Sequence, residues 1–186
     1  MNKQRIRITG MNLIPVILFV LTAGYYLINE KYAVFGQPGN DEFVVVTRVH
    51  DGDTVSVIVD RKPEKIRLIG IDAPEIGQKP WGEEAKRHLE ALLNSSLSKV
   101  RLEYDVEKRD KYGRMLAYLW TSDGKMINFL MVKSGHAMLF TLPPNVKHAD
   151  EFRSAQREAR DGRAGIWAEK GIKERPGDYR KSHPRL

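Results

Sequence analysis

The chain has 186 residues, of which 41% are hydrophobic, so it can bury one sizeable core but not the cores of two full domains. It has no cysteine, which excludes disulfide bonds and thiolate metal sites. Its formal net charge of +7 favours a polyanionic partner, either nucleic acid or anionic lipid headgroups.

The first element along the chain is an apolar segment. Residues 11–28 carry no charge and, with the residues directly before them, have about the length that a helix needs to cross a bilayer. Lys3, Arg5 and Arg7 precede the segment, whereas the residues that follow it carry a negative net charge. The positive-inside rule therefore predicts a cytoplasmic basic end and a signal-anchor transmembrane helix over residues 1–29.

Two other interpretations of this segment remain open. A cleaved signal peptide would release a secreted protein, but Ala23-Gly24 is followed by bulky Tyr25 and Tyr26, which is not a typical cleavage site. A buried soluble helix would have a polar face, which this segment lacks. We therefore expect a single-pass protein of the cell membrane, with its folded domain on the extracytoplasmic side.

A linker over residues 30–42 leads into a β-rich region. Runs of β-branched or alternating residues predict strands over residues 43–50, 54–59, 65–71, 99–107 and 115–121. Asp51-Gly52 between the first two strands is typical of a tight hairpin, because this pair is favoured where φ is positive.

Helices are predicted around these strands. An apolar face predicts a helix over residues 81–93, and a short apolar helix follows over residues 126–134. A last helix is predicted to be capped by Asn145 and to end at Gly162. Strands with helical cover indicate a mainly β domain of the α+β class, although the pattern alone permits either a closed barrel or a mixed sheet.

The composition changes again near the C-terminus. From Gly171 onward the chain is rich in Arg, Lys, Pro and Gly. We interpret residues 171–186 as a basic, disordered tail.

Three short stretches place carboxylates and arginines at turns or strand ends. They are residues 51–54 (DGDT), residues 66–75 (IRLIGIDAPE) and residues 110–114 (DKYGR). Carboxylate oxygens suit Ca²⁺ or Mg²⁺, a further carboxylate can accept a proton from water, and two guanidinium groups can hold a phosphate as its charge builds. This is the chemistry needed to cut a phosphodiester bond with a metal ion.

Each stretch alone also has a simpler interpretation. The first could be only a hairpin turn, Arg67 could be only a structural salt-bridge partner within an apolar strand, and Arg114 could be a solvated charge. Asp72 and Glu75, however, flank a turn that Pro74 stiffens, and such a turn can hold two carboxylates and a backbone carbonyl at one ion.

Together, in this order and at these intervals, the three stretches resemble the signature of the staphylococcal nuclease (thermonuclease) family over roughly residues 41–170. The resemblance implies a five-stranded Greek-key barrel of the OB-fold type with about three helices, over residues 43–170. It also implies a calcium-dependent nuclease of low sequence specificity, acting on DNA, with RNA as a further substrate.

The resemblance also implies roles for individual residues. Asp53, Asp72 and the Ala73 carbonyl would hold the metal ion, Glu75 would activate water, and Arg67 and Arg114 would clamp the phosphate. Lys111, Tyr112 and Phe140 match substrate-contacting positions, whereas Leu142 replaces a tyrosine of the family pattern and alters base stacking.

Two rival functions differ in class from the nuclease. A catalytically silent OB-fold module would bind nucleic acid without cutting it, but such modules usually lose one of the acidic or arginine positions. A peripheral lipid-binding protein would explain the charge and the apolar segment but not the carboxylates. We expect a monomeric enzyme, with no protein partner implied.

Overall fold

The computed structural model describes residue 22, residues 43–94 and residues 98–184 of the chain. The described residues from Phe43 onward belong to one compact unit. The predicted signal-anchor helix, apart from Thr22, and the predicted linker lie outside the described residues. Among the described residues, none of the helices has both the length and the apolar character needed to span a bilayer.

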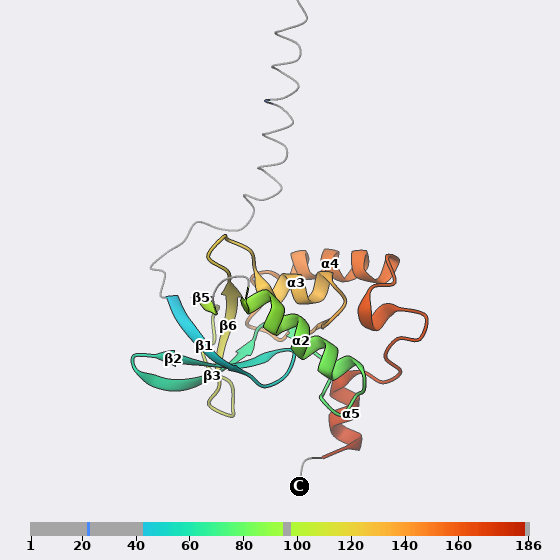
Figure 1. The fold of residues 1–186 in the computed structure, drawn as a ribbon, viewed down its shortest axis with the longest axis horizontal. Coiled ribbons are helices and arrows are strands. Elements are labelled where there is room, and N and C mark those ends of the chain that lie inside the picture. Colours follow the sequence, from blue (N-terminus) through green and yellow to red (C-terminus); the bar gives the residue numbers. More distant parts are fainter. Residues whose placement is uncertain (1–21, 23–42, 95–97, 185–186) are drawn as a thin grey trace, which may run out of the picture. The chain divides into compact units, whose positions relative to one another are not determined.

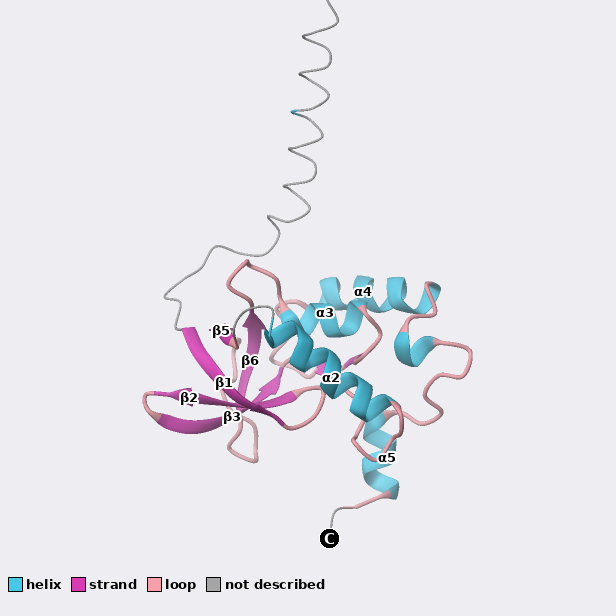
Figure 2. Cartoon of the chain, viewed as in Figure 1, coloured by secondary structure: helices cyan, strands magenta, loops and turns pink. Residues whose placement is uncertain are grey.

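Five strands close into a barrel (Figures 1 and 2). They are β1 (Phe43–Val49), β2 (Thr54–Val59), β3 (Lys62–Leu68), β5 (Lys99–Glu103) and β6 (Met115–Trp120). β1, β2 and β3 form an antiparallel meander, β3 pairs in parallel with β6, and β5 pairs with both β6 and β1 to close the barrel. The predicted closed five-stranded barrel with helical cover is therefore confirmed.

The barrel interior is apolar because alternate residues of a strand point to the same face of the sheet. Val55 and Val57 of β2, Ile66 of β3 and Val100 of β5 are fully buried. Burial of each such side chain contributes about 1.5–3 kcal/mol to stability. The strands therefore form a fixed frame for the residues at their ends.

The predicted third strand, residues 65–71, is interrupted in the structure. β3 begins earlier, at Lys62, and ends at Leu68, and the chain then bends at Gly70, whose φ is +80°. A side chain at Gly70 would also collide with Phe152, since a Cβ would lie 2.2 Å from its ring. Beyond the bend, β4 (Ile71–Asp72) leaves the barrel and pairs with β7 (Met138–Leu139). The bend directs Asp72 away from the barrel wall.

Helices cover one side of the barrel (Figure 2). They are α2 (Trp81–Asn94), α3 (Ile127–Lys133), α4 (Ala149–Asp161), the 3₁₀ helix η1 (Gly165–Trp167) and α5 (Pro176–Ser182). α2 buries Ala85, Leu89 and Leu93, which recur at helical spacing, and it packs against β1 and α3. α3 in turn packs against α4.

Two predictions about the C-terminal half are wrong. α4 begins at Ala149, and Asn145 does not cap it but exchanges two hydrogen bonds with the backbone of Glu107, at 2.8 and 2.9 Å. The tail predicted to be disordered over residues 171–186 contains α5, which begins with Pro176 in its first turn. A proline is well suited to that position because it has no N–H that would need a partner.

Candidate active site

The loop between β1 and β2 positions Asp53. His50 N donates to Thr54 O at 2.9 Å, which closes the loop, and Asp53 N donates to Asp51 Oδ1 at 3.0 Å. The predicted hairpin is confirmed, since β1 pairs antiparallel with β2, but Gly52 does not have the positive φ that was expected of it. Instead, a Cβ at Gly52 would lie 2.7 Å from the Cβ atoms of both Ala73 and Ala85. The glycine is needed for close packing, and this packing brings the loop against the chain after β4.

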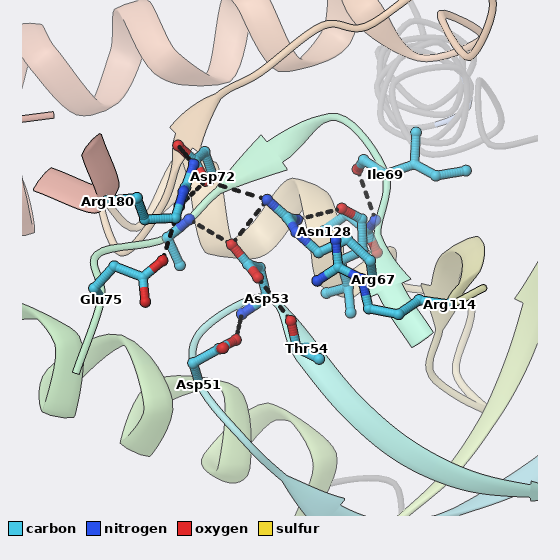
Figure 3. Close-up of polar contacts among 12 residues, drawn as sticks. Asp51, Asp53, Thr54, Arg67, Ile69, Asp72, Glu75, Arg114, Asn128 and Arg180 are labelled. Atoms are coloured by element: carbon cyan, nitrogen blue, oxygen red, sulfur yellow. Dashed lines mark hydrogen bonds and ion pairs between the residues drawn. The ribbon is translucent and has the colours of Figure 1, made fainter. Parts of the chain in front are cut away.

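Asp53 is buried, with 6% of its surface exposed, and both of its carboxylate oxygens have partners. Oδ1 accepts from Thr54 Oγ1 at 3.0 Å, and Oδ2 accepts from the Ala73 backbone N–H at 2.8 Å. Arg67 Nη2 lies 3.1 Å from the same Oδ2. Asp53 therefore joins the β1–β2 loop to β3 and to the turn after β4 (Figure 3).

Arg67 lies between two predicted metal carboxylates. It pairs with Thr54 across β2 and β3, and its Nη2 is 3.1 Å from Asp53 Oδ2 and 3.2 Å from Asp72 Oδ1. Nη1 donates to Leu68 O at 2.8 Å. The side chain is only 14% exposed and forms salt bridges, as the structural interpretation predicted, and these salt bridges join it to the proposed metal carboxylates of the functional interpretation. The structure thus brings Asp53, Arg67 and Asp72 together.

Asn128, which the sequence analysis did not single out, holds the corner that carries these groups. This fully buried residue of α3 donates to Ile69 O at 2.9 Å, and its Oδ1 accepts from Leu119 N at 2.9 Å. Ile69 lies between Arg67 and Asp72 in the chain. Asn128 therefore ties this corner to β6. In the sequence, the feature that could have indicated Asn128 is a polar amide in the first turn of an otherwise apolar helix.

The turn after β4 carries Ala73 and Glu75. Ala73 is 3% exposed, and its position is fixed by the hydrogen bond from its N–H to Asp53. Glu75 N donates to the side chain of Gln78 at 3.0 Å, which holds the turn. Gln78 in turn donates to Glu174 O at 2.8 Å. The turn is therefore linked to the C-terminal segment.

Arg180 of α5 completes this group of side chains, and the sequence analysis missed it. Its Nη1 lies 2.9 Å from Glu75 Oε1 and 3.0 Å from Asp72 Oδ1, and its Nη2 donates to Asp72 Oδ2 at 3.0 Å. Figure 3 shows the guanidinium group between these two carboxylates. Part of the segment predicted to be a solvated tail thus lies in the candidate site.

The four carboxylates Asp51, Asp53, Asp72 and Glu75, hereafter the carboxylate cluster, meet only two guanidinium groups in these contacts, those of Arg67 and Arg180. Burial and the neighbouring Asp53 raise the pKa of Asp51 to about 6. Burial also raises the pKa of Asp72, although the hydrogen bond from Arg180 opposes the shift. The site is thus electrostatically prepared for a further cation.

Arg114 lies at the end of the turn before β6 and contacts a different carboxylate. Its Nε donates to Asp110 Oδ2 at 2.7 Å, and its backbone N donates to Asp110 Oδ1 at 3.0 Å. It directly precedes β6, whose first residue, Met115, pairs in parallel with Ile66. The barrel therefore brings Arg114 to the strand beside Arg67, but the structure gives it no contact with the carboxylate cluster.

The predicted substrate residues are exposed. Tyr112 is 73% exposed and Phe140 is 46% exposed, and Lys111 Nζ lies 5.1 Å from the centre of the Tyr112 ring. Phe140 N donates to Gly70 O at 2.9 Å. Leu142, at the position where the family pattern has a tyrosine, is 63% exposed. These side chains are accessible to a ligand.

The predicted metal ligands fit a hard cation. Asp53 and Asp72 converge closely enough to share one arginine nitrogen, and oxygen ligands are those that Ca²⁺ and Mg²⁺ prefer. Within the described residues, no group of three or more His, Asp or Glu side chains is arranged to hold a metal ion by side chains alone. A backbone carbonyl such as that of Ala73, water and substrate oxygens would have to complete the coordination.

Comparison with known proteins agrees with this chemistry. Residues 65–169 match the family described as "Staphylococcal nuclease homologue". The chain is 35% identical over 164 residues to a thermonuclease of Staphylococcus intermedius, which covers 86% of this chain and 96% of that protein. It is 34% identical over 170 residues to a thermonuclease of Staphylococcus hyicus, with the same coverage. It is 37% identical over 135 residues to endonuclease YncB of Bacillus subtilis (strain 168), which covers 69% of this chain and 63% of that protein.

Proposed function

The chain belongs to the staphylococcal nuclease family and is a nuclease that hydrolyses phosphodiester bonds, and from that premise we propose that it is calcium-dependent and of low sequence specificity. Its proposed substrates are DNA and, as a further substrate, RNA. The observation that carries the proposal is the position of Arg67, which contacts both Asp53 and Asp72. A phosphate-binding cation and two carboxylates for a metal ion are thereby adjacent.

Asp53, Asp72 and the Ala73 carbonyl are the proposed metal ligands. A calcium ion held there would act as a Lewis acid toward the phosphate. Ca²⁺ accepts six to eight oxygen ligands in flexible geometry, which suits a site that water and substrate must complete. Mg²⁺ demands a stricter octahedron and is therefore expected to bind without supporting the full rate.

The remaining residues have complementary proposed roles. Glu75 accepts a proton from the attacking water, because it is not a proposed metal ligand and directly follows the stiff turn that carries Asp72 and Ala73, whereas Asp51, the other carboxylate that is not a ligand, accepts the Asp53 N–H. Arg67 and Arg114 bind phosphate oxygens and stabilise the charge that builds in the transition state. Lys111, Tyr112 and Phe140 contact the nucleotide, and their exposure supports this role.

A digestion assay of the full-length protein in detergent tests the proposed function. Single-stranded DNA, double-stranded DNA and RNA are incubated with Ca²⁺, with Mg²⁺, or with Ca²⁺ and EGTA. Cutting should require Ca²⁺ and stop with EGTA. Asp53→Asn should abolish it, whereas the matched variant Asp123→Asn, at an exposed carboxylate paired with Lys125, should cut normally. Full activity in EGTA, or binding without cutting, would contradict the proposal, and the latter would favour a silent OB-fold module.

We also propose that residues 1–29 anchor the enzyme in the cell membrane, with the nuclease domain on the extracytoplasmic side. The charge asymmetry across the apolar segment supports this orientation. Protease treatment of spheroplasts and N-terminal sequencing test it. Protection from protease would overturn the orientation, and a mature form beginning after about Ala23 would indicate a secreted, cleaved protein.

A further inference from the structure

α5 is seated on the turn that carries Glu75. A Cβ at Gly77 would lie only 2.4 Å from the Tyr179 hydroxyl, so the tyrosine uses the space that the glycine leaves. Gln78 donates to Glu174 O just before the helix. Pro176, the first residue of α5, is buried. These contacts hold a helix of only seven residues in one place, although it has almost no apolar face of its own.

This seat places Arg180 over both oxygens of Asp72. Nη1 contacts Oδ1 and Nη2 contacts Oδ2, each at 3.0 Å, while Nη1 also contacts Glu75. Oδ1 of Asp72 is shared with Arg67 as well. Each oxygen that Asp72 could offer to a metal ion is therefore already in contact with a guanidinium nitrogen.

A metal ion and Arg180 need the same oxygens. A calcium ion binds carboxylate oxygens at 2.3–2.6 Å. On the oxygens of Asp72 it would therefore lie close to the Arg180 guanidinium, and the two cations would repel each other. Because Arg180 is attached to the chain, it is present at the site at a high effective concentration. Calcium must therefore displace it.

We propose that Arg180 is a built-in competitor for the metal ion, so that α5 blocks the carboxylate cluster until calcium and nucleic acid displace it. This inference rests on the proposed calcium site. Arg67 contacts only Oδ1 of Asp72, so departure of Arg180 alone frees Oδ2 for calcium. Arg67 stays in place in both states, because it lies on β3 and donates to Leu68 O. Arg180 has a side chain that is 41% exposed and lies on α5, outside the barrel strands, so it can leave without disturbing the barrel.

Calcium titration of the full-length protein without nucleic acid, followed by calorimetry, tests the proposal. Arg180→Gln should bind Ca²⁺ at least about tenfold more tightly than the wild type, because a hydrogen-bonded charge pair no longer has to break. Tyr179→Ala should also increase calcium affinity, because it weakens the contacts that hold α5 against the turn while the Arg180 guanidinium stays in the protein. The matched control is Lys181→Ala on the same helix, whose side chain is 79% exposed and pairs with Asp178, and it should bind as the wild type does.

A second readout follows α5 itself. Hydrogen exchange of the backbone amides over residues 177–182 should become faster when calcium is added to the wild type, because the helix then loses its contacts with the turn. Unchanged or weaker calcium binding by Arg180→Gln would overturn the proposal. In that case a reduced kcat at saturating calcium would identify Arg180 as a residue that positions Glu75. If the expected calcium affinities are measured but neither the wild type nor any variant cleaves nucleic acid, the result would contradict the proposed function and leave the competition between Arg180 and calcium standing.

Discussion

Glu103 and Asp53 are both largely shielded from solvent, with 14% and 8% of their side chains exposed, but their surroundings differ. Glu103 is contacted by three donor side chains. Trp120 Nε1 donates to it at 2.6 Å, and Lys147 Nζ and His148 Nε2 lie 2.6 and 3.2 Å from its Oε1. We call these four residues the Glu103 network. Asp53, in contrast, belongs to the carboxylate cluster, in which Arg67 and Arg180 are shared among Asp53, Asp72 and Glu75.

The pKa values follow this difference. Burial alone would raise the pKa of Glu103, but hydrogen bonds from His148 and Lys147 outweigh it and lower that pKa to about 2. In the carboxylate cluster, burial prevails and raises the pKa of Asp51 and Asp72. A carboxylate surrounded by donors stabilises the fold, whereas carboxylates gathered with fewer donors lower stability, which is typical of a functional site.

The largest expected effect is on turnover, which should depend on the candidate active site and not on the Glu103 network. Glu75→Gln and Arg114→Ala should each lower kcat for cleavage at saturating calcium by about a hundredfold or more, since each removes a contact worth about 3 kcal/mol to the transition state. The melting temperature should change little, because both residues lie at the edges of loops. Near-wild-type turnover in either variant would refute its assigned role.

Glu103→Gln should show the opposite behaviour. Loss of the charge weakens the hydrogen bonds from Lys147 and His148, so the free energy of unfolding should fall by about 2 kcal/mol in urea denaturation. Cleavage at saturating calcium should be unchanged. The control is Glu158→Gln, at an exposed ion pair with Lys133, which should cost less than about 0.5 kcal/mol. A large loss of kcat with Glu103→Gln would show that the two regions are not independent.

The pH dependence of stability should show the pH range in which the Glu103 carboxylate stabilises the fold. The pKa is 4.5 for a free glutamate and about 2 in the folded protein, so the carboxylate stabilises the fold fully above about pH 4.5 and progressively less as the pH falls toward 2. The difference in unfolding free energy between the wild type and Glu103→Gln should therefore shrink by about 1–2 kcal/mol over this range. A difference that stays constant with pH would contradict the assignment.

The smallest expected effect has the opposite sign. Asp51→Asn should stabilise the protein in EGTA by about 1 kcal/mol, because it removes one partly buried negative charge beside Asp53. The asparagine oxygen can still accept from Asp53 N, so the loop keeps its hydrogen bond. Asp60→Asn in the exposed β2–β3 turn is the matched control, expected within about 0.5 kcal/mol of the wild type. Destabilisation by Asp51→Asn would mean that the cluster holds no excess of negative charge.

The sequence predicted the part of the site that depends on local structure. Asp53, Arg67 and Asp72 lie close together in the chain, and the hydrophobic alternation of the strands around them determines which way they face. The barrel closure and the role of each residue followed from the family resemblance. Gly52 was misinterpreted because its packing against Ala73 and Ala85 depends on tertiary structure that no turn rule describes.

The role of Arg180 is hidden in the sequence by the composition of the segment around it. The basic, proline-containing end of the chain is typical of a disordered segment, and a short helix without an apolar stripe gives no periodic signal. A local signal was nevertheless present, since Pro176 and Asp178 suit the first turn of a helix and Lys181 suits the last. The contact with Asp72 is between distant parts of the chain and could not be predicted from spacing.

The parallel pairing of β3 with β6 has a consequence for how the enzyme acquires its activity during folding. The meander of β1, β2 and β3 contains only neighbouring segments, so it can form early and bring Asp53 and Arg67 together. Arg114 reaches its place only when Met115 pairs with Ile66, which are separated in the chain by the segment that contains β4, α2 and β5. Such a non-local contact is entropically costly and therefore slow to form. The return of cleavage after dilution from denaturant thus reports the closure of the barrel and not the formation of the first hairpins.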